Sequence, residues 1–489
     1  MIENKSFDGI KNKSLLDFRS FINGEWKDSP DKTEVFNPFN QKLIATTSVH
    51  GSKDTKLAIE AAHSSLNEWK KILPQERSDL LRSWFDLINQ NIDDIARIMT
   101  IEQGKPLADS ITEIKYGASF VEWFAEESKR IHGEVYPTNK LSNKYIGINE
   151  PIGVVGAITP WNFPMAMITR KICPAIAAGC TIVLKPSEET PLTAIALVKL
   201  AEQAGFPKGV INLVLGDSKE IGLELTNNNK VRKLSFTGST AVGKILYKQS
   251  ADTLKKLSLE LGGNAPFIVF DDANLKLAVA GLAAAKSRNT GQACTSVNRV
   301  YVSEKIFDKF VALLLPEFKK LKIGNGLDKN INQGPLINKK AADKVTKLVA
   351  DAISNGSKII HQDKNDLGGS FFPPTLIEVT KQNLDIEKEE IFGPVIALYK
   401  FNCSDEEIVE RANNTNYGLA SYFYSESKNR IWNISSKLEY GMVGVNESMI
   451  SNAYIPFGGV KHSGFGREGS IHGIHEYLQI KYIALGDSE

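Results

Sequence analysis

The chain of 489 residues is poor in cysteine and carries almost no net charge. Its four cysteines stand at positions 173, 180, 294 and 403, without a CxxC pair. Neither a disulfide framework nor a thiolate zinc site is expected, and the seven scattered histidines suggest no metal site. The 59 Lys and Arg against 57 Asp and Glu leave a charge of +2. This balance argues against a broad face for nucleic acid or membrane.

A targeting signal is also missing from the start of the sequence. Residues 1–19 are polar and contain lysines, without a continuous apolar core, which argues against a secretory signal and gives little support to a transit peptide. We therefore expect a cytoplasmic protein. The length exceeds what one hydrophobic core usually organises, so two or three domains are expected, and 42% apolar residues can fill them.

Short apolar runs alternate with amphipathic stretches, a pattern typical of parallel sheets built from strand-helix-strand units. In the first half we predict strands at 152–159, 181–184, 212–214 and 233–236, with helices at 166–178 and 194–204. A second alternating region has predicted strands at 265–270 and 393–401 and helices at 275–287 and 307–321. Residues 129–150 and the last dozen residues look like isolated strands outside both halves.

Two short runs of the chain suit the oxidation of an aldehyde. Cys294 ends the run NTGQAC at 289–294, and Glu260 stands in LELGGN at 259–264. A thiolate can add to a carbonyl, the hemithioacetal can lose hydride, and water activated by a carboxylate can cleave the resulting thioester. Taken alone, Cys294 is equally consistent with an inert buried thiol.

The two runs resemble the signature motifs of the aldehyde dehydrogenase superfamily. The resemblance extends from INGEW at 22–26 to PFGG at 456–459. Within the superfamily the chain is most similar to the succinate-semialdehyde dehydrogenases, on EQGKPLA at 102–108, FVEWFAEE at 120–127 and MITRK at 167–171. The more specific motifs narrow the expected function to one subgroup.

The resemblance implies an α/β fold with two open-sheet domains and a β arm for oligomerisation. The expected Rossmann-like NAD-binding domain covers residues 1–128 and 152–261, and the catalytic domain covers residues 262–471. The expected arm comprises residues 129–151 and 472–489. In the family such an arm pairs with a neighbouring subunit, so a homodimer or homotetramer is implied.

The catalytic roles implied by the resemblance fall on Cys294, Glu260, Asn162 and Lys171. Cys294 is the nucleophile, and Glu260 activates water for deacylation. The side-chain amide of Asn162 acts with the backbone N–H of Cys294 on the oxyanion, although on local grounds an Asn between Trp and Pro is a turn former. Lys171 supports cofactor positioning and a proton relay. Glu260 also argues against relatives that pass the thioester to coenzyme A, because they lack this base.

A nicotinamide cofactor is expected at the turn in FTGSTAVG at 236–243, where a strand opens into a helix whose N-terminus can hold a pyrophosphate. The cofactor contacts implied by the resemblance are Thr159, Trp161, Lys185, Ser187, Glu188, Gly238, Ser239, Glu390 and Phe392. Glu188 can accept hydrogen bonds from both ribose hydroxyls but repels a 2′-phosphate. We therefore expect NAD to be preferred, with NADP possible.

Arg170, Arg288 and Ser451 coincide with residues that hold succinate semialdehyde in the resembled subgroup. Two guanidinium groups converging on one pocket would select an aldehyde with a distal carboxylate. Glutarate semialdehyde and 2-oxoglutarate semialdehyde remain alternatives, because pocket depth sets chain length. A catalytically silent binding or structural homologue is a remote alternative, since Cys294, Glu260 and Asn162 are all present. Ser296 stands where some subgroup members have a second cysteine, so no disulfide switch operates there.

Overall fold

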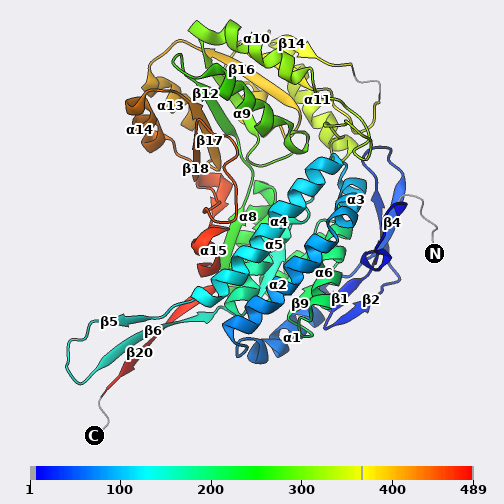
Figure 1. The fold of residues 1–489 in the computed structure, drawn as a ribbon, viewed down its shortest axis with the longest axis vertical. Helices are drawn as coiled ribbons and strands as arrows, with labels where there is room; N and C mark the ends of the chain where they lie inside the picture. Colours follow the sequence, from blue (N-terminus) through cyan, green and yellow to red (C-terminus); the bar gives the residue numbers. More distant parts are fainter. Residues whose placement is uncertain (1–6, 365–366, 487–489) are drawn as a thin grey trace.

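A computed structural model describes residues 7–364 and 367–486. Two lobes, each organised around its own sheet, meet near the middle of the molecule, and a three-stranded arm projects from the lower lobe (Figure 1). Within the described residues, every helix is too short or too polar to cross a membrane.

The first sheet has eight strands and a parallel centre. Its order is β19 (Gly464–Phe465), β11 (Lys256–Glu260), β10 (Val231–Thr237), β7 (Val154–Ile158), β8 (Thr181–Lys185), β9 (Ile211–Leu213), β1 (Ser20–Ile22) and β2 (Glu25–Lys27). The strands from β11 to β9 pair in parallel, whereas β19, β1 and β2 pair antiparallel to their neighbours. The four strands predicted in this half are confirmed, with ends shifted by at most two residues.

Helices cover both faces of the first sheet. One layer contains α2 (Pro74–Gln90), α3 (Ile92–Gln103), α4 (Leu107–Glu127), α5 (Ala166–Ala178) and α6 (Pro191–Ala204). The other contains α1 (Ser52–Trp69), α7 (Ser218–Asn227) and α8 (Thr240–Gln249). Successive side chains of a strand point to opposite faces, so Val155 packs in the first layer and Val154 in the second. A sheet buried on both faces explains why its strands are apolar throughout.

Helix α5 follows β7 and is buried along its whole length. Its predicted bounds, residues 166–178, are confirmed. The helix ends at Gly179, whose φ of +92° is the left-handed conformation that favours glycine at this position. Because α5 lies between β7 and the rest of the core, polar side chains on it must find partners inside the protein.

The second sheet has seven strands. Its order is β14 (Lys358–Gln362), β15 (Thr375–Glu378), β16 (Val395–Phe401), β13 (Val297–Ser303), β12 (Ala265–Val269), β17 (Ala420–Tyr424) and β18 (Met442–Val445). All neighbours are parallel except β14 and β15. One face packs α9 (Leu275–Ser287) and α10 (Phe307–Phe318). The other packs α11 (Lys339–Ser354), α12 (Asp385–Lys388), α13 (Asp405–Asn413) and α14 (Lys428–Lys437).

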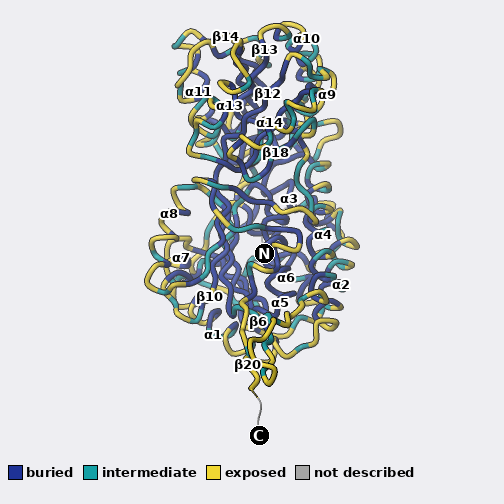
Figure 2. The backbone as a smooth tube through the Cα atoms, turned by 90° about the vertical axis from the view of Figure 1, so that its left-hand side faces the viewer, coloured by how far each residue is buried: buried dark blue, intermediate teal, exposed yellow. Residues whose placement is uncertain are grey.

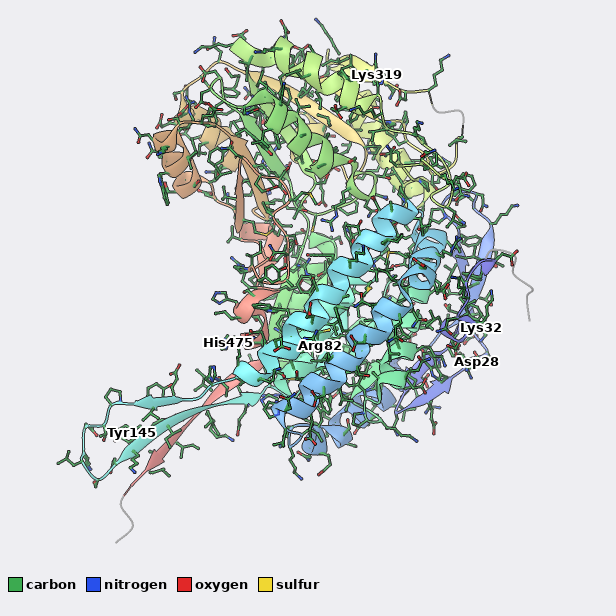
Figure 3. The ribbon with its side chains drawn as sticks, in the orientation of Figure 1. Asp28, Lys32, Arg82, Tyr145, Lys319 and His475 are labelled. Atoms are coloured by element: carbon green, nitrogen blue, oxygen red, sulfur yellow. The ribbon has the colours of Figure 1, made fainter. Side chains whose placement is uncertain are left out.

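The arm is an antiparallel sheet of β5 (Glu134–Tyr136), β6 (Lys144–Pro151) and β20 (Leu478–Leu485), and α15 (Ser470–His475) precedes β20. Figure 2 shows the arm as mostly exposed, in contrast to the buried sheets of the lobes. Tyr145 lies on the arm away from the body (Figure 3), where its ring packs against Tyr482 at 5.7 Å between centroids. A separate hairpin of β3 (Lys32–Phe36) and β4 (Leu43–Ser48) lies near the N-terminus.

One short strand returns from the end of the chain to the first sheet. Gly464 and Phe465 of β19 pair with Glu260 and Leu259 of β11. The expected catalytic domain, residues 262–471, includes these residues, whereas their backbone hydrogen bonds join them to the other half. This return brings the segment around Glu468 next to β11 and α5, which matters for the site.

Candidate active site

A cavity of about 560 Å³ opens where the two lobes meet. Trp161 and Asn162 follow β7, Gly238 and Ser239 follow β10, and the remaining wall comes from the second half of the chain. The predicted site residues that line it are Trp161, Asn162, Gly238, Ser239, Cys294, Glu390 and Phe392. The carboxyl ends of parallel strands meet at one edge of a sheet, which is the usual location of ligands in such folds.

Cys294 lies in a tight loop between α9 and β13. Asn289, Thr290 and Gly291 have consecutive φ angles of +48°, +59° and +74°, so the chain turns sharply just before the nucleophile. Behind the loop, a Cβ on Gly263 would collide with the Cys294 carbonyl oxygen. Burial raises the pKa of the half-buried Cys294 thiol to about 12, and the Glu390 carboxylate adds to this effect. The thiol is therefore protonated at neutral pH and needs a base to react.

Glu260 stands at the end of β11 and is 3% exposed. Neither of its carboxylate oxygens has a hydrogen-bond partner within the described residues. Burial raises the pKa of Glu260 well above its usual value, and the negative charge of Glu468 contributes. A carboxylate with a raised pKa and free lone pairs is suited to accept a proton.

Asn162 is 6% exposed, and its amide is anchored on one side. Its Nδ2 donates to the carbonyl oxygen of Gln292 at 3.1 Å, two residues before Cys294. An amide nitrogen carries two protons, so a second N–H remains to donate to a substrate oxygen. Asn162 and the backbone of the nucleophile loop are thereby held together, as an oxyanion site requires.

The residues predicted to hold the adenine ribose form a charged cluster at the end of β8. Lys185 Nζ lies 2.8 Å from Glu188 Oε1, and the Ser218 hydroxyl bonds to both side chains. Burial alone would raise the pKa of Glu188, but the Lys185 ammonium lowers it below its usual value. The carboxylate is therefore ionised and oriented. The Ser187 Oγ accepts from the backbone N–H of Glu189 at 3.2 Å.

Further along the cavity, Ser239 caps α8 by accepting a hydrogen bond from Val242 N at 3.3 Å. At the opposite wall, Glu390 Oε1 accepts from Gly263 N at 2.9 Å, and burial raises the pKa of Glu390 to about 7. The rings of Trp161 and Phe392 meet edge to face at 5.6 Å.

Thr159 lies at the end of β7, beside the predicted ribose cluster. Its backbone N–H donates to the carbonyl oxygen of Lys185 at 3.0 Å, while its Oγ1 is buried without a hydrogen-bond partner among the described residues. A polar ligand in the cavity could satisfy this hydroxyl.

The three residues predicted to bind the substrate carboxylate separate into two places. Arg288 lines a second cavity of about 290 Å³ together with Phe163 and Met449. Its guanidinium lies over the rings of Phe163, at 4.8 Å, and Tyr116, at 5.5 Å. The Tyr116 hydroxyl in turn bonds to the hydroxyl of Ser451. Tyr116 thus connects Arg288 with Ser451.

Arg170 is instead 2% exposed and forms an ion pair with Glu468, with Nη2 and Oε2 2.6 Å apart. Lys171 is fully buried beside it and donates to the other Glu468 oxygen at 2.5 Å. Burial opposes ionisation of Glu468, but these two cations lower its pKa below the usual value. The two predicted residues therefore share one buried carboxylate, next to Glu260.

Comparison with known proteins matches residues 26–483 to the aldehyde dehydrogenase family. The chain belongs to the aldehyde dehydrogenase family. It is 49% identical to the glutarate-semialdehyde dehydrogenase of Pseudomonas aeruginosa over 480 residues, covering 98% of this chain and 99% of that one. With the NADP(+) succinate-semialdehyde dehydrogenase of Escherichia coli it shares 48% identity over 480 residues, at 98% and 99% coverage. The solved structure of succinate-semialdehyde dehydrogenase from Burkholderia pseudomallei superposes with a TM-score of 0.96 at 50% identity, covering 98% of this chain and 100% of that one.

The expected fold and family are confirmed by these comparisons. This aldehyde dehydrogenase is an oxidoreductase that acts on aldehydes with a nicotinamide cofactor, and the cluster of Lys185, Glu188 and Ser218 has the donors and acceptors that a ribose needs. The names of the relatives differ in the substrate, so the family alone does not select among semialdehydes.

Two residues of this aldehyde dehydrogenase escaped sequence reasoning. Glu468 is separated by 297 positions from Lys171, and no local pattern indicates that it balances two cations of α5. Ser218, the first residue of α7, was equally hidden, although its position after the N-cap Asp217 marks a helix start that faces the cofactor strands. In both cases β-sheet topology, rather than spacing, creates the contact.

Proposed function

We propose that this aldehyde dehydrogenase oxidises succinate semialdehyde to succinate, prefers NAD over NADP, and works through a thioester on Cys294. The substrate proposal rests on the position of Arg288. Within the described residues it forms no ion pair, yet it lines a cavity beside the nucleophile loop. A guanidinium in this situation favours a ligand with a carboxylate, which can accept two parallel hydrogen bonds.

In the first half of the reaction, the Cys294 thiol loses its proton to solvent, and Glu260 is kept for the second half. The sulfur then adds to the aldehyde carbon. The developing oxyanion is stabilised by the free N–H of Asn162 and by the backbone N–H of Cys294. A bound nicotinamide would supply the hydride acceptor, held near Glu390 and Phe392. Loss of hydride leaves an acyl group on Cys294.

In the second half, water attacks the thioester carbon, and Glu260 takes a proton from that water. The carbon–sulfur bond breaks, succinate leaves, and the sulfur recovers a proton. Burial and the Glu468 charge raise the Glu260 pKa, while the Arg170 and Lys171 cations oppose this rise. Such balance suits a group that must both accept and release a proton.

The preference for NAD rests on Glu188, whose carboxylate would repel a 2′-phosphate. Replacing it, Glu188→Ser, should raise the ratio of kcat/KM for NADP to that for NAD at least about tenfold. Glu189→Ser is the matched control, because Glu189 contacts Asn338 rather than Lys185. An unchanged ratio in Glu188→Ser would remove the basis for the preference.

A five-carbon semialdehyde is the second candidate, since a relative of 49% identity is named a glutarate-semialdehyde dehydrogenase. The test is a comparison of kcat/KM for succinate, glutarate and 2-oxoglutarate semialdehydes, with butanal as the substrate without a carboxylate. Our proposal requires the four-carbon semialdehyde to be preferred, and at least about tenfold over butanal. A higher value for either five-carbon compound would reassign the substrate.

We also propose that the arm pairs with a neighbouring subunit in a homodimer or homotetramer. Its exposed apolar side chains support this, among them Val135 at 81% and Ile480 at 65% exposure. An open sheet edge with such side chains needs a partner to avoid uncontrolled pairing. Light scattering during gel filtration should give a multiple of the 53.9 kDa chain mass, and a monomer would contradict the proposal.

A further inference from the structure

The segment that joins α3 to α4 reaches the catalytic loops from behind. Gln103 and Lys105 belong to the EQGKPLA run and are at most 1% exposed. Neither side chain lines the main cavity. Both nevertheless contact residues that control Asn162 and Cys294, so the burial of these two polar groups needs a functional account.

Hydrogen bonds fix the orientation of two side-chain amides in series. The backbone N–H of Lys105 donates to Gln103 Oε1 at 3.0 Å, which turns Gln103 Nε2 toward Asn289. Gln103 Nε2 then donates to Asn289 Oδ1 at 3.0 Å, which turns Asn289 Nδ2 in the opposite direction. An amide presents donors at one end and an acceptor at the other, so each contact determines the next.

Asn289 Nδ2 ends the series at the oxyanion site. It donates to the carbonyl oxygen of Asn162 at 2.9 Å and to that of Gln292 at 3.1 Å. The same Gln292 carbonyl accepts from Asn162 Nδ2. One side chain therefore joins the peptide of the oxyanion residue to the loop that carries Cys294. The φ of +48° at Asn289 is a conformation that Asn tolerates better than most residues.

Lys105 provides a second attachment for the same peptide. Its ammonium donates to the Asn162 carbonyl oxygen at 2.7 Å and pairs with Glu113. Glu113 in turn accepts from the backbone N–H groups of Met165 and Ala166, at the start of α5. The Asn162 carbonyl is thus held by two donors from outside its own segment, and its amide has little freedom to turn.

We propose that Gln103, Lys105 and Asn289 are positioning residues that aim the Asn162 amide at the oxyanion formed on Cys294. The inference rests on the proposed function, because it assumes that Cys294 is the nucleophile and that Asn162 is the oxyanion donor. None of the three lines the cavity that contains Cys294, whereas Lys105 and Asn289 line the neighbouring Arg288 cavity. We assign them a positioning role because they fix the direction of one amide.

The test compares two reactions of the same thiol in the full-length protein. 4-Nitrophenyl acetate acylates Cys294 through an oxyanion, forming a carbon–sulfur bond and releasing 4-nitrophenolate. Iodoacetamide alkylates Cys294 by displacing iodide from a saturated carbon, and no oxyanion forms. The ratio of the two rate constants reports oxyanion stabilisation, because thiol ionisation and loop position affect both reactions. Peptide mass mapping assigns both products to Cys294.

Gln103→Glu keeps the size of the side chain and the acceptor for Lys105 N, but it places an oxygen against Asn289 Oδ1. Asn289 should then reverse its amide and turn an oxygen toward the carbonyls of Asn162 and Gln292. The acylation-to-alkylation ratio should fall at least about tenfold. Gln103→Met removes both hydrogen bonds without adding charge, and a smaller fall, about threefold or more, is expected. Gln103→Met alone tests the inference if Gln103→Glu does not fold.

Glu102→Gln is the matched control. Glu102 is equally buried and adjacent in the chain, but it accepts from the backbone N–H groups of Leu192 and Thr193 at the start of α6. Its ratio should stay within about twofold of the unmodified protein. The inference is overturned if the acylation-to-alkylation ratio of both Gln103 variants stays within about twofold of that of the unmodified protein. This holds even when the acylation and alkylation rate constants fall together. Failure of either reagent to label Cys294 in the unmodified protein would count against the proposed function itself.

Discussion

Arg170 and Arg288 were both predicted to bind the substrate carboxylate, yet their surroundings in the structure differ. Arg170 is 2% exposed, pairs with Glu468 and lies 3.8 Å from the centroid of the Phe457 ring. Arg288 lies over two aromatic rings at the edge of a cavity that Asp109 also lines, and among the described residues it forms no ion pair. One guanidinium is neutralised within the protein, whereas the other keeps its charge available for a ligand.

The difference teaches that the partner of a cation, rather than its place in a motif, indicates its role. A buried arginine that already has a carboxylate contributes mainly through the structure and the electrostatics around it. An arginine that lies over aromatic rings and forms no ion pair can bind an incoming anion without first breaking one. Arg170 stays a predicted substrate contact, but Arg288 with Ser451 carries the stronger case.

The largest effect is expected from removing the carboxylate that balances Arg170. Glu468→Gln leaves two buried cations, Arg170 and Lys171, without their counter-ion. Breaking a buried ion pair in this way typically costs about 3–5 kcal/mol. Chemical denaturation should show a loss of unfolding free energy in that range. A change below about 1 kcal/mol would contradict the structural role of the cluster.

The same substitution should also change the pH dependence of deacylation. Glu260 must be unprotonated to accept a proton from water, so the rate rises with pH through its raised pKa. The Glu468 charge raises that pKa; removing the charge lowers it, and the rising limb should move to lower pH. Glu476→Gln is the control, because Glu476 pairs with Lys233 and Lys256 instead. The electrostatic effect of Glu468 on Glu260 is contradicted if the rising limb moves to higher pH in Glu468→Gln, or if Glu476→Gln shifts the limb by the same amount.

Arg288→Gln tests the second arginine of this comparison as a contact for the substrate carboxylate. A hydrogen bond to a charged group contributes about 1.5–3 kcal/mol, so kcat/KM for succinate semialdehyde should fall about 10- to 150-fold. Activity with butanal should change little, and unfolding free energy should fall by less than about 1 kcal/mol. Arg82→Gln, on α2 (Figure 3), removes a partly exposed arginine that pairs with Glu122 and Glu126, and kcat/KM for both substrates should stay unchanged. Equal losses with butanal would rule out carboxylate recognition.

Regular structure was more predictable from the sequence than were the contacts between distant segments. The helix at 166–178 was predictable because its apolar pattern and the following Gly179 are local signals. The pairing of Lys171 with Glu468 was not, because it depends on β19 returning to the edge of the first sheet. Arg170 and Arg288 illustrate the same limit: sequence supplied the residues, but counter-ions become visible only when the sheets are assembled.

Ser451→Ala should give the smallest effect of the series. Its hydroxyl bonds to Tyr116, whose ring lies beneath the Arg288 guanidinium. Loss of one uncharged hydrogen bond corresponds to about a 2- to 10-fold decrease in kcat/KM for succinate semialdehyde. The double variant with Arg288→Gln should lose less than the product of the single effects, because both residues act on one carboxylate. Multiplicative losses would indicate that they act separately.

The most direct test of the thioester mechanism is to trap the acyl group on Cys294. In Glu260→Gln the water is no longer activated, so succinate semialdehyde and NAD should leave a succinyl group on the enzyme. Mass spectrometry of the digested protein should find this group on the peptide containing Cys294, with about one NADH formed for each acylated site. No adduct in this variant, or an adduct on another residue together with full activity in Cys294→Ala, would contradict the account.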